Sequence, residues 1–188
     1  MKSLSQVLLA LAVVVGAAAC GDSTSPSGSG LTRVYLKDAP FPIGDVKSVE
    51  IYVVSVAVSP SGDTLMNDWI TVAEPRKRFD LLTLQGGTTA LLGEKELPAG
   101  AYREVRFVMN TDSSSIVWAD GHPATVHWGY PGEISLHPLV QQPMGIPAEG
   151  SHLVVDFNVA QTFPYNLIPG YEFDFLPTIQ VTVEPAGP

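Results

Sequence analysis

Apolar and polar side chains alternate with a period of two along most of this chain. In one such segment Val105, Phe107 and Met109 share one face, and Glu104 and Arg106 share the other. This period is typical of a half-buried β-strand, whose successive side chains point to opposite faces. The pattern predicts strands at 31–36, 46–58, 69–72, 101–109, 116–118, 125–128, 153–159 and 179–183.

The longest predicted strand, 46–58, changes its apolar face halfway along. The odd-numbered residues from Val49 to Val53 are apolar, and beyond them the even-numbered residues from Val54 to Val58 are apolar. One extra residue in a strand exchanges the two faces without ending the strand. We therefore expect a β-bulge near Val53 and Val54.

Turn-forming residues separate these segments at intervals of about ten residues. In the stretch 79–110, two strand-like runs are joined by 97–100, where Pro98 and Gly100 favour chain reversal. We expect this stretch to form a hairpin-like unit around which the rest of the fold is organised. The best helical segment is 80–85, which Gly86 and Gly87 end. The sequence thus predicts an all-β chain with a short helical turn at most, folded as an antiparallel β-sandwich.

The first 19 residues have the pattern of an export signal. Lys2 is followed by the apolar run 7–15, which is too short to span a membrane as a helix. Residues 17–20 read Ala-Ala-Ala-Cys and resemble the bacterial lipobox, at which the cysteine is acylated and the leader is removed. Cys20 is the only cysteine, so no disulfide within the chain accounts for it. An ordinary leader with a small-residue cleavage site is the alternative.

Residues 20–30 are expected to form a lipidated cysteine and a flexible linker. After Cys20 the linker has no apolar residue and is rich in Ser and Gly, so it buries too little surface to order itself. Residues 31–188 then form one β-sandwich domain. Gly21, rather than Asp, follows Cys20, and by resemblance to known sorting signals this favours the outer membrane over the inner one.

The charge balance is acidic. Removal of residues 1–19 takes away Lys2 and no acidic residue, which changes the formal charge from −9 to −10. This balance repels phosphate backbones, so nucleic acid is not expected as a partner.

Six segments together carry a resemblance to a known family. They are VYLKDAP at 34–40, VKSVEIYVVSVAV at 46–58, FDLLTLQGGTTALLG at 79–93, LPAGAYREVRF at 97–107, VVDFNVA at 154–160 and LPTIQV at 176–181. The family that they resemble is the bacterial and archaeal domain of unknown function 4382. The resemblance implies a transthyretin-like or immunoglobulin-like sandwich that occurs in lipoproteins and surface proteins, and it implies no activity or site. The segment 128–150 does not resemble the family.

Motifs of catalysis are missing from the sequence. It has no G-x-S-x-G and no cysteine free for a Cys-His pair, and the serines at 113–115 beside Asp112 are typical of a turn. The outward acidic residues Glu104, Asp156, Glu172 and Asp174 form no recognisable pair for glycoside cleavage. We therefore expect a protein that is not an enzyme.

Metal chemistry has weak sequence support. The histidines at 122, 127, 137 and 152 have no zinc spacing. Asn110, Asp112 and Asp120 fall in predicted loops near one end of the sheet, and their oxygens suit Ca²⁺. A calcium site there is an alternative to their ordinary role in turns, and no other cofactor is expected.

Trp118, Trp128 and Tyr130 are the residues with which a sandwich of this kind would bind a glycan by stacking. If Asp120 and Gly121 form a two-residue turn, Ala119 pairs with His122, and Trp118 and Trp128 fall on opposite faces. One tryptophan would then be in the core, and the apolar rim would be limited to 128–130.

Two functions fit these observations. The first is a lipid-anchored, non-enzymatic structural or protein-interaction module of the cell envelope, for which a free strand edge is expected. The second is a module that binds a glycan, a peptide or Ca²⁺, for which a pocket with converging aromatic or acidic residues is expected around 128–150.

Overall fold

The computed structural model describes residues 28–42, 44–61, 68–140 and 144–186. The predicted leader, Cys20 and residues 21–27 of the predicted linker lie outside this part of the chain. Nearly all of the described secondary structure is β-strand, which confirms the predicted fold class. No described helix is long and apolar enough to cross a membrane.

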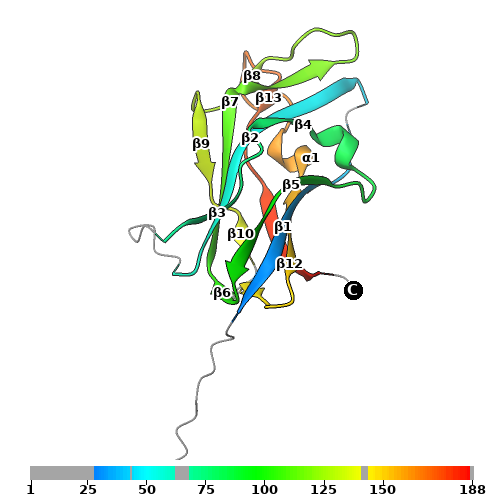
Figure 1. Ribbon diagram of the computed structural model, residues 1–188. Coiled ribbons are helices and arrows are strands. Elements are labelled where there is room, and N and C mark those ends of the chain that lie inside the picture. Colours follow the sequence, from blue (N-terminus) through cyan, green and yellow to red (C-terminus); the bar gives the residue numbers. More distant parts are fainter. Residues whose placement is uncertain (1–27, 43, 62–67, 141–143, 187–188) are drawn as a thin grey trace, which may run out of the picture.

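Two β-sheets face each other across a shared core (Figure 1). The first sheet has the order β10 (Leu139–Val140), β14 (Ile179–Pro185), β12 (Ser151–Phe157), β1 (Ser29–Asp38) and β5 (Ala90–Pro98). The second has the order β3 (Ile70–Ala73), β2 (Val46–Ser59), β7 (Glu104–Trp118) and β9 (Glu133–Leu136), and β4 (Lys77–Asp80) also pairs with β2. Two short ladders pair β6 (Gly100–Tyr102) with β11 (Met144–Ile146), and β8 (Val126–His127) with β13 (Phe173–Asp174).

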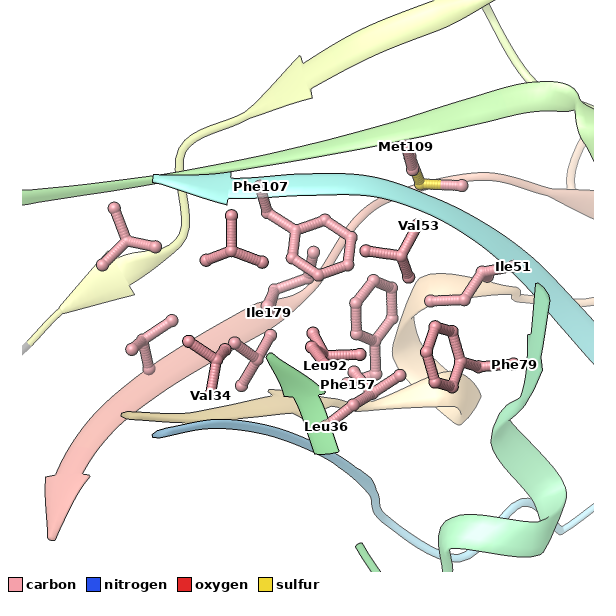
Figure 2. Close-up of a cluster of buried hydrophobic side chains, with 14 of the residues drawn as sticks. Val34, Leu36, Ile51, Val53, Phe79, Leu92, Phe107, Met109, Phe157 and Ile179 are labelled. Atoms are coloured by element: carbon pink, nitrogen blue, oxygen red, sulfur yellow. The ribbon is translucent and has the colours of Figure 1, made fainter. Parts of the chain in front are cut away.

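The core fills the space between the two sheets. Figure 2 shows Phe107 and Val53 of the second sheet pointing toward Leu36 and Phe157 of the first. The rings of Phe107 and Phe157 meet edge to face with their centroids 5.4 Å apart. Such contact between fully buried aromatic rings adds to the free energy gained by burying their area. The alternating apolar face predicted for the strand at 101–109 is the face that lines this core.

The expected bulge in β2 is confirmed. The register between β2 and β7 shifts between Val53 and Ser55, and again between Val46 and Ser48 and between Glu50 and Tyr52. At the first of these shifts both Val53 and Val54 are buried. Because of the extra residue, the apolar side chains that are buried change from odd-numbered to even-numbered positions, as the sequence pattern predicts.

The two described helical turns are four residues long. The first, η1 (Leu81–Leu84), lies inside the predicted segment and begins where the Asp80 carboxylate accepts a hydrogen bond from the N–H of Leu82. The second, α1 (Val159–Thr162), is capped in the same way by Asn158, which accepts from the N–H of Gln161. Both turns start at residue types that favour helix N-termini.

The predicted hairpin-like unit at 79–110 is wrong. The strand before the 97–100 turn, β5, pairs with β1 in the first sheet, whereas β7 after it pairs with β2 in the second. Between them β6 pairs with β11. The turn therefore carries the chain from one layer to the other, because both strands find partners that are distant in the sequence.

The sandwich is mixed rather than purely antiparallel. β1 pairs with β12 in parallel, and so do β10 with β14 and β13 with β8. Parallel neighbours require a long connection, and β1 and β12 are separated by most of the chain.

The first strand, β1, begins at Ser29, two residues before the predicted start, and Gly30 is buried.

The segment expected to be a loop, 130–150, supplies strands to three ladders. β9 is an edge strand of the second sheet, β10 is an edge strand of the first, and β11 pairs with β6. Each of these strands has two to four residues, too few for a period of two to stand out from the surrounding prolines and glycines.

Candidate functional site

Trp118 and Trp128 do not form an exposed platform. The hairpin after β7 pairs Val117 with Pro123, and the N–H of Trp118 donates to the carbonyl of His122. Its loop thus has three residues, not the predicted two, with Gly121 at a φ of 94°. The register moves by one residue, so the predicted placement of the two tryptophans on opposite faces is wrong. Both are partly buried against the core.

The third aromatic residue of the proposed glycan site, Tyr130, is isolated. Its side chain is 78% exposed, and its carbonyl accepts a 2.9 Å hydrogen bond from the hydroxyl of Thr111. Trp118 instead contacts Tyr165 and Phe173, and Trp128 contacts Phe163 and Phe175. Trp118 and Trp128 therefore cover one end of the core, and Tyr130 does not join them in a sugar-binding surface.

The residues suggested for calcium are not brought together. The Asn110 side chain accepts a 2.9 Å hydrogen bond from the N–H of Ser113 and belongs to the bulged part of β7. Asp112 is exposed in the same strand. Asp120 lies beyond the end of β7, in the turn of the following hairpin. No group of three or more His, Cys, Asp or Glu side chains in the described residues is placed to hold a metal ion.

Three of the four histidines pair with three different acidic residues, and the fourth packs against an aromatic ring. His122 pairs with Asp120, His127 with Asp174 at 3.3 Å, and His137 with Glu104 at 3.5 Å. His152 packs against the ring of Tyr35. The acidic residues Asp156 and Glu172 have further partners, Lys37 for the first and Thr125 and Trp118 for the second. These interactions tie neighbouring strands and loops together.

A groove of about 660 Å³ lies at the end of the sandwich where β1 begins. Its walls come from β14 on one side and from β6 and β11 on the other. The lining residues carry no ionisable side chain: Gly100, Ala101, Met144, Gly145, Ile146, Pro147, Val181, Thr182, Val183 and Pro185. Such a groove suits a neutral, mainly apolar ligand.

One wall of the groove is an edge of the first sheet. β10 pairs with β14 only at Gln180 and Val181. Beyond Val181, β14 continues to Pro185 and pairs with β12 on its other side. Among the described residues no strand pairs with 182–185 on the groove side. Within the described residues, 182–185 thus form an unpaired edge on this side, of the kind that can accept a further strand.

The groove adjoins the point where the chain enters the domain. A Cβ atom at Gly30 would lie 2.2 Å from the carbonyl oxygen of Pro147, and one at Gly28 would lie 3.4 Å from the Cβ of Ala148. The start of β1 thus packs against the segment that follows β11. Figure 1 shows this end of the molecule opposite the end that carries β8 and β13.

The sequence located this site only in part. The expected pocket around 128–150 exists in the sense that 144–147 line the groove, but no aromatic or acidic side chain converges there. The edge of β14 had no sequence signal, because an alternating strand has the same pattern in the middle of a sheet and at its edge.

Comparison with known proteins identifies a family without assigning an activity. A family model described as "Domain of unknown function (DUF4382)" matches residues 29–174. This range includes the segment 128–150, so the expectation that this segment departs from the family is wrong, and it ends before 176–181 and β14. No curated protein and no solved structure matches the chain.

Proposed function

The chain belongs to the family of domain of unknown function 4382, and we propose that it is a non-enzymatic, lipid-anchored protein of the bacterial cell envelope that binds an extended peptide segment of a partner protein. The peptide adds as a strand to the edge of β14. The observation that carries this proposal is the stretch 182–185, which borders the apolar groove and has no described strand on that side.

Strand addition fits the chemistry of the groove. The backbone N–H and C=O groups of an edge strand bind the backbone of a peptide, and alternate side chains of the peptide enter the groove. Because the lining has no ionisable side chain, alternate apolar residues match it best. The glycan or calcium module expected as the alternative has less support, since the groove brings together neither aromatic nor acidic side chains.

The anchor would place the groove near the membrane. The lipobox-like residues 17–20 and the Ser- and Gly-rich linker precede β1, and β1 begins beside the groove. A lipid-modified Cys20 with several acyl chains would hold the protein stably, since each buried CH₂ contributes about 0.8 kcal/mol. A partner segment that emerges close to the bilayer would then reach the groove, and the outer membrane is the preferred location.

The anchor is tested with Cys20→Ala. We expect the wild-type chain to fractionate with membranes and the variant to be found in the soluble fraction. Membrane fractionation of the variant would show that Cys20 is not the anchor, and it would leave the groove proposal intact.

The groove is tested with the lipidated chain in phosphatidylcholine nanodiscs and two synthetic peptides. One is an eight-residue peptide of alternating valine and serine, and the other is the same peptide with every amide N-methylated. We expect the first to bind at least tenfold more tightly and to protect from hydrogen exchange those amides of 182–184 that face the groove rather than β12. Equal binding of the two peptides would exclude strand addition, because the methylated peptide has no backbone N–H to donate.

A matched pair of variants localises the binding. A Cβ atom at Gly145 meets nothing within 4 Å, and the same is true of Gly44, which does not line the groove. We expect Gly145→Leu to fill the groove and weaken peptide binding at least tenfold, and Gly44→Leu to leave it unchanged.

A further inference from the structure

One short loop at the opposite end of the sandwich exposes four large apolar side chains. In the loop 164–172, which we call the tip loop, Tyr165 is 49% exposed, Leu167 58%, Ile168 40% and Tyr171 39%. Single exposed apolar residues are common on protein surfaces, but a cluster of this kind marks an interaction site. The tip loop leads from α1 to β13, at the end of the molecule away from the start of β1 (Figure 1).

The exposure of these side chains is fixed by the structure of the loop. The N–H of Asn166 donates to the carbonyl of Glu172 at 2.9 Å. The N–H of Ile168 donates to the Asp174 carboxylate, which is 2% exposed, at 3.2 Å. Tyr165 also pairs with Phe173. Because these hydrogen bonds already order the loop, little conformational entropy is lost when a partner binds to its apolar side chains.

The surface beside the tip loop is acidic. Glu172 belongs to the loop and accepts a hydrogen bond from the Trp118 indole at 3.0 Å. The Trp118 ring in turn contacts Tyr165 and lines a shallow hollow together with Asp45 and Asp120.

Positive charge beside these carboxylates is limited. Lys47 follows Asp45 along the chain, His122 pairs with Asp120, and His127 pairs with Asp174. Within the described residues neither Asp45 nor Glu172 forms an ion pair, so both carboxylates can attract a positively charged partner.

We propose that the tip loop is a second docking surface, which binds a segment of another protein carrying both apolar and basic side chains. The apolar side chains of that segment cover Leu167 and Ile168, and its basic side chains approach Asp45, Asp120 and Glu172. The same carboxylates disfavour an anionic membrane and a second copy of this acidic chain, because like charges would meet at the contact.

The surface is independent of the groove. The two lie at opposite ends of the sandwich, so a chain anchored beside the groove presents the tip loop away from its own membrane. One protein would thereby connect a membrane-proximal segment with a more distant partner. Loss of either interaction leaves the other in place, which keeps their tests separate.

The test uses the lipidated chain in phosphatidylcholine nanodiscs and two ten-residue probes, one of alternating lysine and leucine and one of alternating glutamate and leucine. Empty nanodiscs give the background. We expect the lysine peptide to bind and the glutamate peptide to bind at least tenfold more weakly. We also expect affinity for the lysine peptide to fall as salt is raised. Equal binding of the two peptides, or no binding of the lysine peptide, would overturn the proposal.

Variants assign the binding to the loop. The double variant Leu167→Ser/Ile168→Ser changes only exposed side chains and is expected to fold and to bind the lysine peptide at least tenfold more weakly. Leu91→Ser, at an exposed leucine of β5, is the matched control and should bind as the wild type does. Asp45→Asn/Asp120→Asn should reduce both the affinity and its salt dependence.

Two other results would show that something other than an apolar and basic protein segment binds the tip loop, and either would reject the proposal. Binding of the wild-type chain to phosphatidylglycerol vesicles that the double variant abolishes would indicate a membrane surface. Concentration-dependent self-association that the double variant abolishes would indicate a second copy of the chain.

Discussion

The backbone N–H of Val159 donates a 3.0 Å hydrogen bond to the Oδ1 atom of Asp38, 121 residues earlier in the chain. The Oδ2 atom of the same carboxyl accepts a 3.1 Å hydrogen bond from the Gln85 side chain. Asp38 therefore joins the end of β1 to the start of α1 and to the residue after η1. Desolvation by burial outweighs these hydrogen bonds and raises the pKa of Asp38 from 3.8 to about 6.

Replacement of Asp38 by asparagine should stabilise the protein at neutral pH. The folded-state pKa lies above the unfolded value, so the ionised carboxylate opposes folding above about pH 6, and this cost decreases as the pH falls from 6 toward 3.8. Asparagine carries no charge and can still accept from Val159, and its NH₂ can donate to the Gln85 side chain once that amide turns its oxygen toward residue 38. We expect the free energy of unfolding of Asp38→Asn at pH 7.5 to exceed that of the wild type by about 1 to 3 kcal/mol, measured by urea denaturation.

The pH dependence of this difference is the decisive measurement. The gain should shrink between pH 7 and pH 4.5, where wild-type Asp38 becomes protonated. Asp112→Asn, at an exposed aspartate of β7, is the control and should show no such change. A difference between Asp38→Asn and the wild type that is constant over this range would contradict the raised pKa.

The close approach of β1 to the segment after β11 predicts a large effect of Gly30→Ala. The new Cβ would lie 2.2 Å from the Pro147 carbonyl oxygen and 2.9 Å from the Gly150 nitrogen, both backbone atoms. Backbone has to move to admit it, and we expect a loss of about 3 kcal/mol in the free energy of unfolding. Gly145→Ala, where the added methyl meets nothing within 4 Å, should change stability by less than about 0.5 kcal/mol.

The elements that the sequence predicted correctly are those that depend on neighbours along the chain. The bulge in β2 follows from the change of apolar parity at Val53 and Val54, and η1 follows from Asp80 before an apolar run. By contrast, the pairing of β5 with β1 and of β7 with β2 depends on partners far away in the sequence. No local pattern distinguishes that arrangement from a hairpin at 97–100.

The positions of the candidate site residues depended on the length of one turn and on the conformation of one loop. The loop of the hairpin after β7 is one residue longer than expected, so His122 pairs with Trp118 instead of Ala119, and both tryptophans pack against the core. The tip loop has an ordinary loop composition, with Pro169 and Gly170 among its apolar residues. Only the three-dimensional structure shows that these apolar residues face solvent while Phe163 and Phe173 on either side are buried.

The contact between Phe107 and Phe157 should contribute strongly to stability. Both side chains are fully buried, one in each sheet. We expect Phe107→Ala to lower the free energy of unfolding by about 3 to 5 kcal/mol, measured by chemical denaturation. Tyr130→Ala, at a residue that is 78% exposed, should cost less than about 0.5 kcal/mol. Additivity of Phe107→Ala and Phe157→Ala in the double variant would show that the two rings do not interact.

Glu172 is expected to keep Trp118 in place, and tryptophan fluorescence can report it. The carboxylate accepts hydrogen bonds from the Trp118 indole at 3.0 Å and from the Thr125 N–H at 2.7 Å. The hydrogen bonds from Thr125, followed by the one from Trp118, lower the pKa of Glu172 below its ordinary value of 4.5. The hydrogen-bonded, ionised form therefore stabilises the folded state above about pH 4.5, and this contribution is lost as the pH falls through the lower folded-state pKa.

In Glu172→Gln, the amide NH₂ cannot accept, so at least one of these donors loses its partner. We expect a loss of about 1 kcal/mol in the free energy of unfolding at pH 7 and a red shift of the emission as Trp118 becomes more exposed. Glu149→Gln, at an exposed glutamate beyond β11, is the control. Because the Glu172 carboxylate is itself proposed to attract basic side chains, and because Trp118 contacts Tyr165 of the tip loop, Glu172→Gln should weaken binding of the lysine peptide and leave binding of the valine–serine peptide unchanged. Unchanged emission would show that Glu172 does not position Trp118.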